Sequence, residues 1–152
     1  LEKDYQLIWQ TGKLDYKNIL EETKDIHSRN IQIVEFIKNM EMAYSAADVI
    51  VSRAGAIAIS ELAIAKKPVL LVPFPFAAED HQTKNAQTLV EKNAAKMVKD
   101  TEMKEKFWNT LSEICENEDL RTEMAQNLDF FAKPKATEEI VNEIFKNLNI
   151  KE

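Results

Sequence analysis

Two short runs, DVIV at 48–51 and VLLV at 69–72, are apolar at nearly every position. A strand with one solvated face alternates apolar and polar residues, whereas a strand covered on both faces does not. Each run is followed by a longer stretch with helical spacing, at 56–66 and 81–92. Strands that alternate with helices at this interval indicate βαβ units and a parallel sheet.

The same alternation continues on both sides of this region. Further strands are expected at 5–10, 31–36 and 95–98, and the two apolar runs extend to 48–52 and 68–73. Helices are expected at 14–24, 40–46, 56–66, 81–92, 102–115, 120–132 and 137–148, with Pro134 between the last two. We therefore predict one α/β domain over residues 1–152, a Rossmann-like doubly wound parallel sheet with helices on both faces.

Length and composition allow a globular domain and argue against some functions. The chain has 152 residues, of which 45% are hydrophobic and 30% charged, so it can bury a core and is not of the disordered type. The net charge of −6 argues against a broad nucleic-acid-binding face, which needs clustered Lys and Arg. It is compatible with one small anionic ligand, because a helix N-terminus can bind phosphate without any lysine.

The single cysteine, Cys115, excludes an internal disulfide and fits a reducing compartment. Its place in a helical apolar pattern predicts a core thiol. No apolar run approaches the ~20 residues that span a bilayer, and the charged start, LEKDYQ, is not a signal peptide. The chain lacks an initiator Met and begins almost on a strand, so we expect it to be a piece of a longer protein.

In open parallel sheets, ligands bind beyond the carboxyl ends of the strands. Functional residues are therefore expected in three loops, at 36–37, 52–56 and 74–82. Phe36 and Ile37 close the second predicted strand, where an aromatic and an aliphatic side chain could enclose a base while main-chain groups hydrogen-bond its edge. Plain core packing is the alternative for this pair.

Gly55 lies between a buried strand and a helix, where the backbone needs either positive φ or close approach of a ligand. A tight turn is the simpler interpretation. Neither a G-x-G-x-x-G nor a Walker A fingerprint is present, since Gly12 is the only other glycine. The N–H groups at the start of the helix at Ala56 could still bind a diphosphate.

Glu61 shares a helix face with Ile57, Ala58, Ile64 and Ala65, which are all apolar. A carboxylate among buried apolar neighbours is costly unless it has hydrogen-bond partners. One interpretation is that its two oxygens bind a vicinal diol, such as the 2′- and 3′-hydroxyls of a ribose. The alternative is an ordinary outward-facing acid beside Ser60.

The segment FPFAAEDHQTKNA, residues 74–86, follows a buried strand and carries aromatic and polar groups. Asp80 is expected to be the N-cap of the next helix, which places His81, Gln82 and Asn85 at or near the first turn. The amide of Gln82 has the donors and the acceptor that sugar hydroxyls require. Structural roles for His81 and Gln82 are the alternative.

Three segments together resemble the C-terminal half of the peptidoglycan N-acetylglucosaminyltransferase (MurG) family. They are VEFIKNM at 34–40, VSRAGAIAISELA at 51–63 and KKPVLLVPFPFAAEDHQTKNA at 66–86. S-R-A-G-A, the helical Glu and HQ-x-x-NA, in this order and spacing, form a specific combination. The likeness extends from IWQTGK near the start to ATEEIVNEI near the end.

In that family these segments surround the donor, UDP-N-acetylglucosamine. The resemblance implies that Ile37 binds uracil through its main chain, that the helix start binds the diphosphate, and that Glu61 binds the ribose diol. Gln82, with His81 and Asn85, would bind the hydroxyls of the sugar. The family often has a hydroxyl residue where Ala58 stands, so that side chain offers phosphate no hydrogen bond here. The complete implied substrate-binding set is Phe36, Ile37, Met40, Ala56, Ile57, Ala58, Ile59, Ser60, Glu61, His81, Gln82 and Asn85.

The family reaction is an inverting transfer of N-acetylglucosamine to a lipid-linked muramyl-pentapeptide, which makes lipid II for peptidoglycan. The resemblance implies a two-domain GT-B enzyme with no metal and no cofactor, acting in the cytoplasm on the inner face of the bacterial membrane. The acceptor site, the general base and the membrane contact would lie in an N-terminal domain outside this sequence, as would the first strand and glycine-rich loop of the C-terminal domain. No catalytic residue is therefore expected in these 152 residues, which should be inactive alone.

Three alternatives remain from the sequence. The chain could belong to another UDP-sugar enzyme of the same architecture, either a different transferase or a UDP-N-acetylglucosamine epimerase. It could be a non-catalytic binding or assembly module. It could also be a doubly wound domain whose loop residues are all structural.

Overall fold

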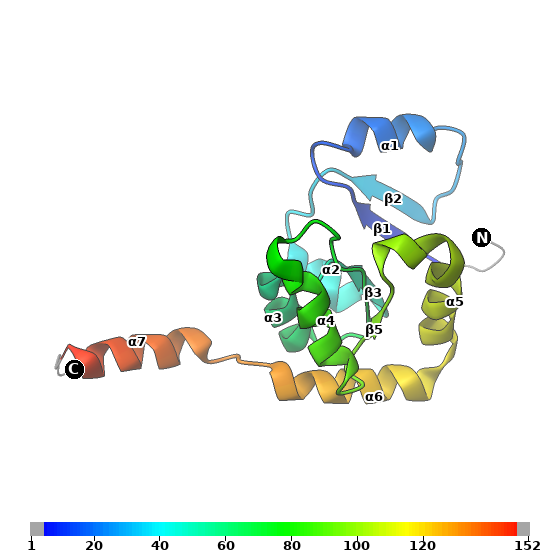
Figure 1. The fold of residues 1–152 in the computed structure, drawn as a ribbon. Helices are drawn as coiled ribbons and strands as arrows, with labels where there is room; N and C mark the ends of the chain where they lie inside the picture. The colour runs from blue at the N-terminus through cyan, green and yellow to red at the C-terminus, as the bar shows by residue number, and fades with distance from the viewer. Residues whose placement is uncertain (1–4, 149–152) are drawn as a thin grey trace. The chain divides into compact units, whose positions relative to one another are not determined.

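The computed structural model describes residues 5–148 (Figure 1). The chain divides into two units, Leu1–Ala43 and Tyr44–Glu152, which are described in turn. One helix, α2 (Met40–Ala46), crosses the boundary between them.

The first unit contains one βαβ motif. It consists of β1 (Leu7–Gln10), α1 (Tyr16–Glu22) and β2 (Ile31–Val34). The two strands pair in parallel, with Leu7 opposite Ile31. Gly12 follows β1 with a φ of +79°, a left-handed conformation that explains a glycine at this turn. The predicted strands and helix of this region are confirmed, each with shorter bounds.

The second unit contains a three-stranded parallel sheet in the order β3-β4-β5. Its strands and first helices are β3 (Ile50–Ser52), α3 (Ala56–Ala65), β4 (Val69–Leu71), the 3₁₀ turn η1 (Ala78–Asp80), α4 (His81–Val90) and β5 (Lys96–Met97). The remaining elements are η2 (Asp100–Glu102), α5 (Met103–Glu116), α6 (Glu118–Leu128), η3 (Asp129–Phe131) and α7 (Ala136–Asn147). Pro68 and Pro73 flank β4, where a residue without an N–H cannot extend the ladder.

The core of this unit lies on both faces of β4. Val69 and Leu71 belong to a buried cluster with Leu62 of α3 and Leu89 of α4. Leu70, which points to the opposite face of the strand, packs instead in a second cluster. That cluster includes Ile114 of α5 and Met124 of α6. Helices therefore cover both faces of the sheet, which confirms the doubly wound α/β prediction.

Two expectations about the strands are wrong. The strands form two separate parallel sheets, β1-β2 and β3-β4-β5, where one sheet is predicted. Within residues 5–148, β1 pairs only with β2 and β3 only with β4. The second wrong expectation is that the run at 48–51 is covered on both faces, since Val51 of β3 is 45% exposed. Edge strands have fewer neighbours to cover them. That a further strand belongs to this domain stays a prediction.

Cys115 is half-buried on α5 and belongs to neither buried cluster, so the prediction of a core thiol is wrong. It lies next to Ile114, which takes the buried position on that helix. The turn of α5 that carries both residues is tied to α6, because Arg121 donates hydrogen bonds to the carbonyl oxygens of Ile114 (3.1 Å) and Cys115.

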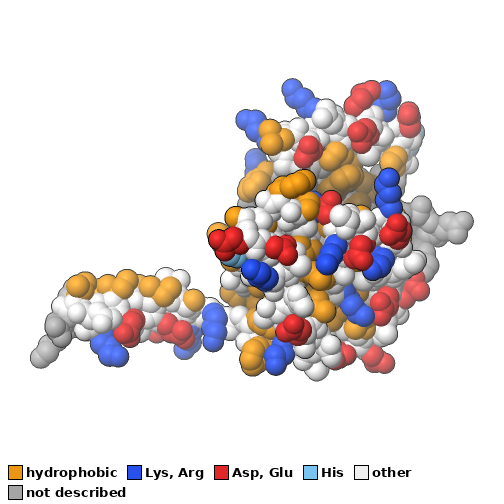
Figure 2. All heavy atoms as spheres, viewed as in Figure 1, with side chains coloured by type: hydrophobic (Ala, Val, Ile, Leu, Met, Phe, Trp, Pro, Cys, Tyr) orange, Lys and Arg blue, Asp and Glu red, His pale blue; other side chains and the backbone are white. Residues whose placement is uncertain are grey.

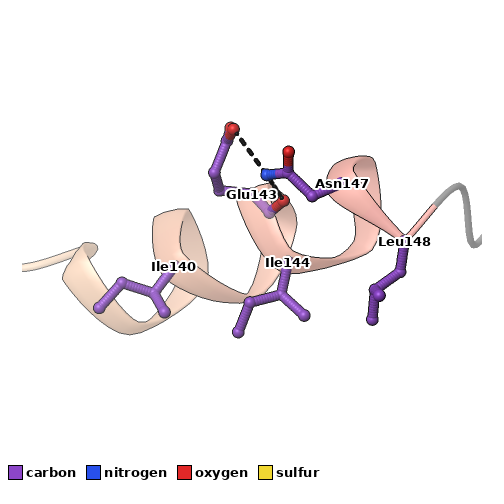
Figure 3. Close-up of a pocket in the computed structure, with 5 residues that line it drawn as sticks. All are labelled: Ile140, Glu143, Ile144, Asn147 and Leu148. Atoms are coloured by element: carbon purple, nitrogen blue, oxygen red, sulfur yellow. Dashed lines mark hydrogen bonds between the residues drawn. The ribbon is translucent and has the colours of Figure 1, made fainter.

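Helix α7 has no buried residue. Ile140, Ile144 and Leu148 point to the same side, while Asn147 donates to the carboxylate of Glu143 at 3.0 Å (Figure 3). Hydrophobic side chains accordingly line one side of the helix and charged ones another (Figure 2). Among residues 5–148, no helix combines the length and the apolar character needed to cross a membrane.

Candidate functional site

Two loops follow neighbouring strands of the second unit at their carboxyl ends. We call them the rim loops: residues 53–55, between β3 and α3, and residues 72–80, between β4 and α4. Because β3 and β4 are parallel and adjacent, both loops lie at the same edge of the sheet. This is the edge at which the sequence predicts a ligand.

The side chain of Gln82, in the first turn of α4, joins the two rim loops. Its Oε1 accepts hydrogen bonds from the backbone N–H of Ala54 (3.1 Å) and from the backbone N–H of Phe74 (3.0 Å). Because both partners are N–H donors, the amide oxygen of Gln82 must face them. The Nε2 group of the same amide therefore faces away from Ala54 and Phe74. Among the described residues, no partner is seen for Nε2.

Asn85 lies one turn further along α4 and contacts the same loop. Its Nδ2 donates to the carbonyl oxygen of Ala54 at 3.2 Å. Both backbone polar groups of Ala54, a fully buried residue, are therefore bonded to side chains of α4. Gln82 and Asn85 thus have structural roles, and their predicted contacts with sugar hydroxyls stay a prediction.

Arg53 makes a second set of contacts between the rim loops, which sequence reasoning missed. Its Nη1 donates to the carbonyl oxygens of Val72 and Pro73, each at 3.2 Å, and to Oδ1 of Asp100 at 2.9 Å. The guanidinium carbon also lies 5.5 Å from the centre of the Phe74 ring, within the range of a cation–π contact. An arginine directly after a predicted strand, on the ligand edge of the sheet, was the available signal.

The N-terminus of α3 lies directly beyond Arg53 and Ala54. Gly55 occupies the N-cap position with φ −68° and ψ 149°, so positive φ is not the reason for a glycine here. A Cβ added at Gly55 would meet nothing within 4 Å. Among the described residues no side chain makes a capping hydrogen bond to this helix, so no side-chain cap competes for the N–H groups of its first turn. Three explanations for this glycine remain: a tight turn, its favourable N-cap position and close approach of a ligand.

Glu61 lies on α3 and has one specific partner. The hydroxyl of Tyr44 donates to Oε2 of Glu61 at 3.1 Å. Partial burial, followed by the hydrogen bond and the negative charge of Glu61, raises the pKa of Tyr44 to about 12. This hydrogen bond orients the carboxylate, because it holds one of its two oxygens.

The predicted apolar surroundings of Glu61 are wrong. Glu61 is exposed, and its helix neighbours Ile57 and Ile64 are 78% and 54% exposed. The reason is that α3 packs through a different side, which buries Leu62 and Ala63. The exposure agrees with the alternative of an outward-facing acid, so no burial cost requires a ligand at Glu61. Its contact with a ribose stays a prediction.

The loop before α4 departs from the expected capping geometry. Asp80 precedes α4 in a left-handed conformation (φ 57°), and its side chain makes no capping hydrogen bond. An N-cap residue needs extended backbone for its side chain to reach the first-turn N–H groups, so the N-cap prediction is wrong. Glu79 is also left-handed (φ 49°). His81 is exposed, with Nε2 3.6 Å from the carboxylate of Glu79.

The residues predicted to bind a base, Phe36, Ile37 and Met40, belong to the first unit. Phe36 is 69% exposed, so plain core packing does not explain it. The backbone N–H of Ile37 donates to Oε1 of Gln10 at 2.8 Å. The sequence did not predict this contact. It occupies the N–H of Ile37, one of the two main-chain groups of this residue that could hydrogen-bond a base. The convergence of this loop with the rim loops stays a prediction.

Within residues 5–148, no group of three or more His, Cys, Asp or Glu side chains is placed to hold a metal ion. The described site offers backbone N–H groups at the start of α3, a carboxylate, and the amides of α4. Such groups bind anions and hydroxyls.

Comparison with known proteins identifies the family. The glycosyltransferase family 28 C-terminal domain matches residues 1–141. The chain belongs to this family. The family 28 domain therefore includes both rim loops and all the predicted site residues.

Curated relatives carry the name UDP-N-acetylglucosamine--N-acetylmuramyl-(pentapeptide) pyrophosphoryl-undecaprenol N-acetylglucosamine transferase. The protein of this name from Cytophaga hutchinsonii is 49% identical over 95% of this chain, and that from Bacteroides fragilis is 44% identical over 94%. The chain spans only 38% of the length of each of these relatives.

Two solved structures share the fold. The crystal structure of Acinetobacter baumannii MurG matches 96% of this chain and 42% of that chain, with a TM-score of 0.82 at 36% identity. A UDP-N-acetylglucosamine 2-epimerase structure matches 97% of this chain and 37% of that chain, with a TM-score of 0.67. Because its identity is only 15%, this second match shows the fold alone. The resemblance to the MurG family is confirmed.

Proposed function

We propose that this chain is the donor-binding half of an inverting N-acetylglucosaminyltransferase. The enzyme would move N-acetylglucosamine from UDP-N-acetylglucosamine to undecaprenyl-diphospho-muramyl-pentapeptide and so make lipid II for peptidoglycan. The observation that carries the proposal is 49% identity over 95% of the chain to a relative whose name states this transfer. The rim loops support it, because they lie where a doubly wound sheet binds its ligand.

The diphosphate would bind at the start of α3. The N–H groups of Ala56, Ile57 and Ala58 belong to the first turn, where a helix carries partial positive charge. Ile59 and Ser60 complete the segment that would face the donor. Gly55 supports this placement, because its missing side chain leaves open space directly before the helix.

The ribose diol would bind to the carboxylate of Glu61. Because Tyr44 holds Oε2, the second oxygen of the carboxylate remains for a sugar hydroxyl. The exposed position of Glu61 supports the proposal in one respect, since a nucleotide can reach it without displacing packed side chains.

The N-acetylglucosamine group would bind beside the first turn of α4. Gln82 would act there as a donor through Nε2, because its Oε1 is engaged by the rim loops. Asn85 would act as an acceptor through Oδ1, because its Nδ2 bonds Ala54. His81 is exposed on the same turn and completes the proposed sugar subsite.

The uracil would bind to the first unit. The carbonyl of Ile37 is the main-chain group that remains for it, because Gln10 occupies the N–H. Phe36 and Met40 would enclose the ring. Gln10 would therefore have to move before the N–H of Ile37 could bind a uracil carbonyl.

The rest of the activity would come from a second domain. The chain spans 38% of the Cytophaga hutchinsonii relative, and we propose that the acceptor site, the catalytic base and the membrane contact lie in a separate N-terminal domain. The complete enzyme would then work in the cytoplasm, at the inner face of the bacterial membrane. The 152-residue chain alone would bind donor groups without transferring the sugar.

A calorimetric titration of UDP-N-acetylglucosamine into the intact two-domain protein tests the proposal. Glu61→Ala should weaken binding by about 1.5–3 kcal/mol, the scale for hydrogen bonds to a charged group. Glu105→Ala, which removes an exposed acid of α5, is the control and should leave the affinity unchanged. Unchanged affinity in Glu61→Ala would return Glu61 to an ordinary surface acid. Absence of binding by the unaltered protein would overturn the proposed function itself.

A further inference from the structure

We propose that Arg53, together with Asp100, is a positioning residue for the sugar of the donor. It would act by holding the loop between β4 and α4 in place against the end of β3. This inference rests on the proposed function and adds to it a residue outside the predicted binding set.

The contacts of Arg53 connect the exits of all three strands of the second sheet. Arg53 itself follows β3, Val72 and Pro73 follow β4, and Asp100 lies just beyond β5. A single nitrogen, Nη1, donates to one atom of each of these three partners. Nη1 carries two hydrogens, so two of these three contacts share one of them.

The Phe74 ring adds a contact to the same loop. The guanidinium group lies over the ring at 5.5 Å, so the loop is held by its backbone at 72–73 and by a side chain at 74. Phe74 in turn packs edge-on against Phe76, with ring centres 5.7 Å apart. Arg53 therefore orders the first half of the loop, before the chain enters α4.

Gln82 links this loop to the proposed sugar subsite. The N–H of Phe74 is one of the two donors that hold the Gln82 amide oxygen, and so direct Nε2 outward. If residues 72–74 shift, this donor shifts with them, and the orientation of the Gln82 amide is no longer determined from both loops. Arg53 would thus act on the sugar through Gln82, without touching the sugar itself.

Exposure distinguishes positioning from a simple contribution to stability. The side chains of Arg53 and Asp100 are 51% and 42% exposed, and ion pairs at such exposure contribute little to the free energy of folding. The larger expected effect is therefore on the position of the loop. Loss of this position should weaken the binding of the sugar part of the donor. It should not weaken the binding of the uridine diphosphate part, which we place at α3 and at the first unit.

The test compares the dissociation constants of UDP and of UDP-N-acetylglucosamine, measured by calorimetry on the intact two-domain protein. Arg53→Met removes all three donated hydrogen bonds and should weaken UDP-N-acetylglucosamine binding about two- to tenfold more than UDP binding, the scale of one lost hydrogen bond between neutral groups. Arg53→Lys, which keeps the charge and some donors, should restore part of this sugar-dependent difference. Asp100→Asn should produce a smaller difference in the same direction.

Arg121→Met is the matched control. Arg121 also donates to two backbone carbonyls, those of Ile114 and Cys115, but between α5 and α6. It should lower the melting temperature without changing the ratio of the two dissociation constants. An equal change for UDP and UDP-N-acetylglucosamine in Arg53→Met, or no change in either, would overturn the positioning role. Failure of the unaltered protein to bind UDP-N-acetylglucosamine would instead contradict the proposed function.

Discussion

The hydroxyl of Tyr44 and the carboxylate of Glu61 are hydrogen-bonded at 3.1 Å, and this contact joins the end of α2 to α3. Glu61 is exposed, so an isolated carboxylate there could sample several rotamers at little cost. The tyrosine selects among them. An acid that must present one oxygen to a diol benefits from this selection, because less side-chain entropy is lost on binding.

Tyr44→Phe should therefore weaken the binding of UDP-N-acetylglucosamine without preventing folding. Loss of one hydrogen bond at a solvent-accessible carboxylate corresponds to about 0.5–1.5 kcal/mol, or roughly a two- to tenfold increase in dissociation constant. Calorimetry on the intact protein measures it. Tyr16→Phe, in α1, should leave the affinity unchanged. Equal affinity in the Tyr44→Phe and unaltered proteins would separate Tyr44 from donor binding.

The same contact predicts a dependence of stability on pH. The pKa of Tyr44 is raised from 10.0 to about 12 in the folded protein, so the folded state holds this proton more tightly than the unfolded state. The stabilisation is complete below pH 10 and is lost as the pH rises toward 12. Because Tyr44 is half exposed, solvent screening should reduce the loss well below the about 1.4 kcal/mol that each unit of pKa represents. Urea unfolding at pH 9 and pH 11 should show a larger fall in stability for the unaltered protein than for Tyr44→Phe, and equal falls would contradict the assignment.

Two substitutions at Gln82 separate its structural role from its proposed role in sugar binding. Gln82→Glu keeps an oxygen for the N–H groups of Ala54 and Phe74 but removes the Nε2 donor, so it should preserve stability and weaken sugar binding. Gln82→Met leaves both N–H groups without this acceptor and should also lower the free energy of unfolding by about 1–3 kcal/mol. Denaturant unfolding and calorimetry, performed on both variants, measure the two effects. Full affinity in Gln82→Glu would exclude the donor role.

Gly55→Ala tests whether a ligand approaches the start of α3. Apart from Gly55 and its two chain neighbours, no described atom lies within 4 Å of the added methyl group. Alanine lowers the entropy of the unfolded chain, which stabilises the protein, but it is a poorer N-cap residue than glycine, which destabilises it. The free energy of unfolding should therefore change by less than about 1 kcal/mol. UDP-N-acetylglucosamine should bind at least about tenfold more weakly, whereas uridine, which lacks the diphosphate, should bind unchanged. If both ligands keep their affinity, the diphosphate does not lie against Gly55.

The elements of this domain could be predicted from the sequence because each depends on local patterns. The apolar run at 69–72 corresponds to a strand covered on both faces, and the helix predicted at 40–46 has the same bounds in the structure. The exposure of Val51 could not be predicted, because an apolar run does not reveal how many strands lie beside it. The division of the strands into two sheets has the same cause, since pairing depends on contacts distant in sequence.

The candidate site was predictable in its location and less so in its contacts. The loops after β3 and β4 follow from the rule for parallel sheets, and Gln82 and Asn85 do lie beside them. Their bonds to Ala54 depend on the orientation of amide groups, which residue spacing does not determine. Arg53 was missed because its partners Val72, Pro73 and Asp100 are far away in sequence. The prediction that Glu61 lies among buried apolar side chains was wrong. Helical periodicity shows which residues share a face of the helix, but not whether other parts of the protein cover that face.

The absence of buried residues on α7 has a consequence for its own persistence as a helix. Twelve residues is about the length below which a helix in water is only marginally formed. Because Ile140 and Ile144 are 61% and 49% exposed in the described structure, the segment should interconvert with coil, and its amide protons should exchange with solvent far sooner than those of α3 or α4. Slow exchange along α7 in a longer protein would then report that its apolar side has acquired a cover.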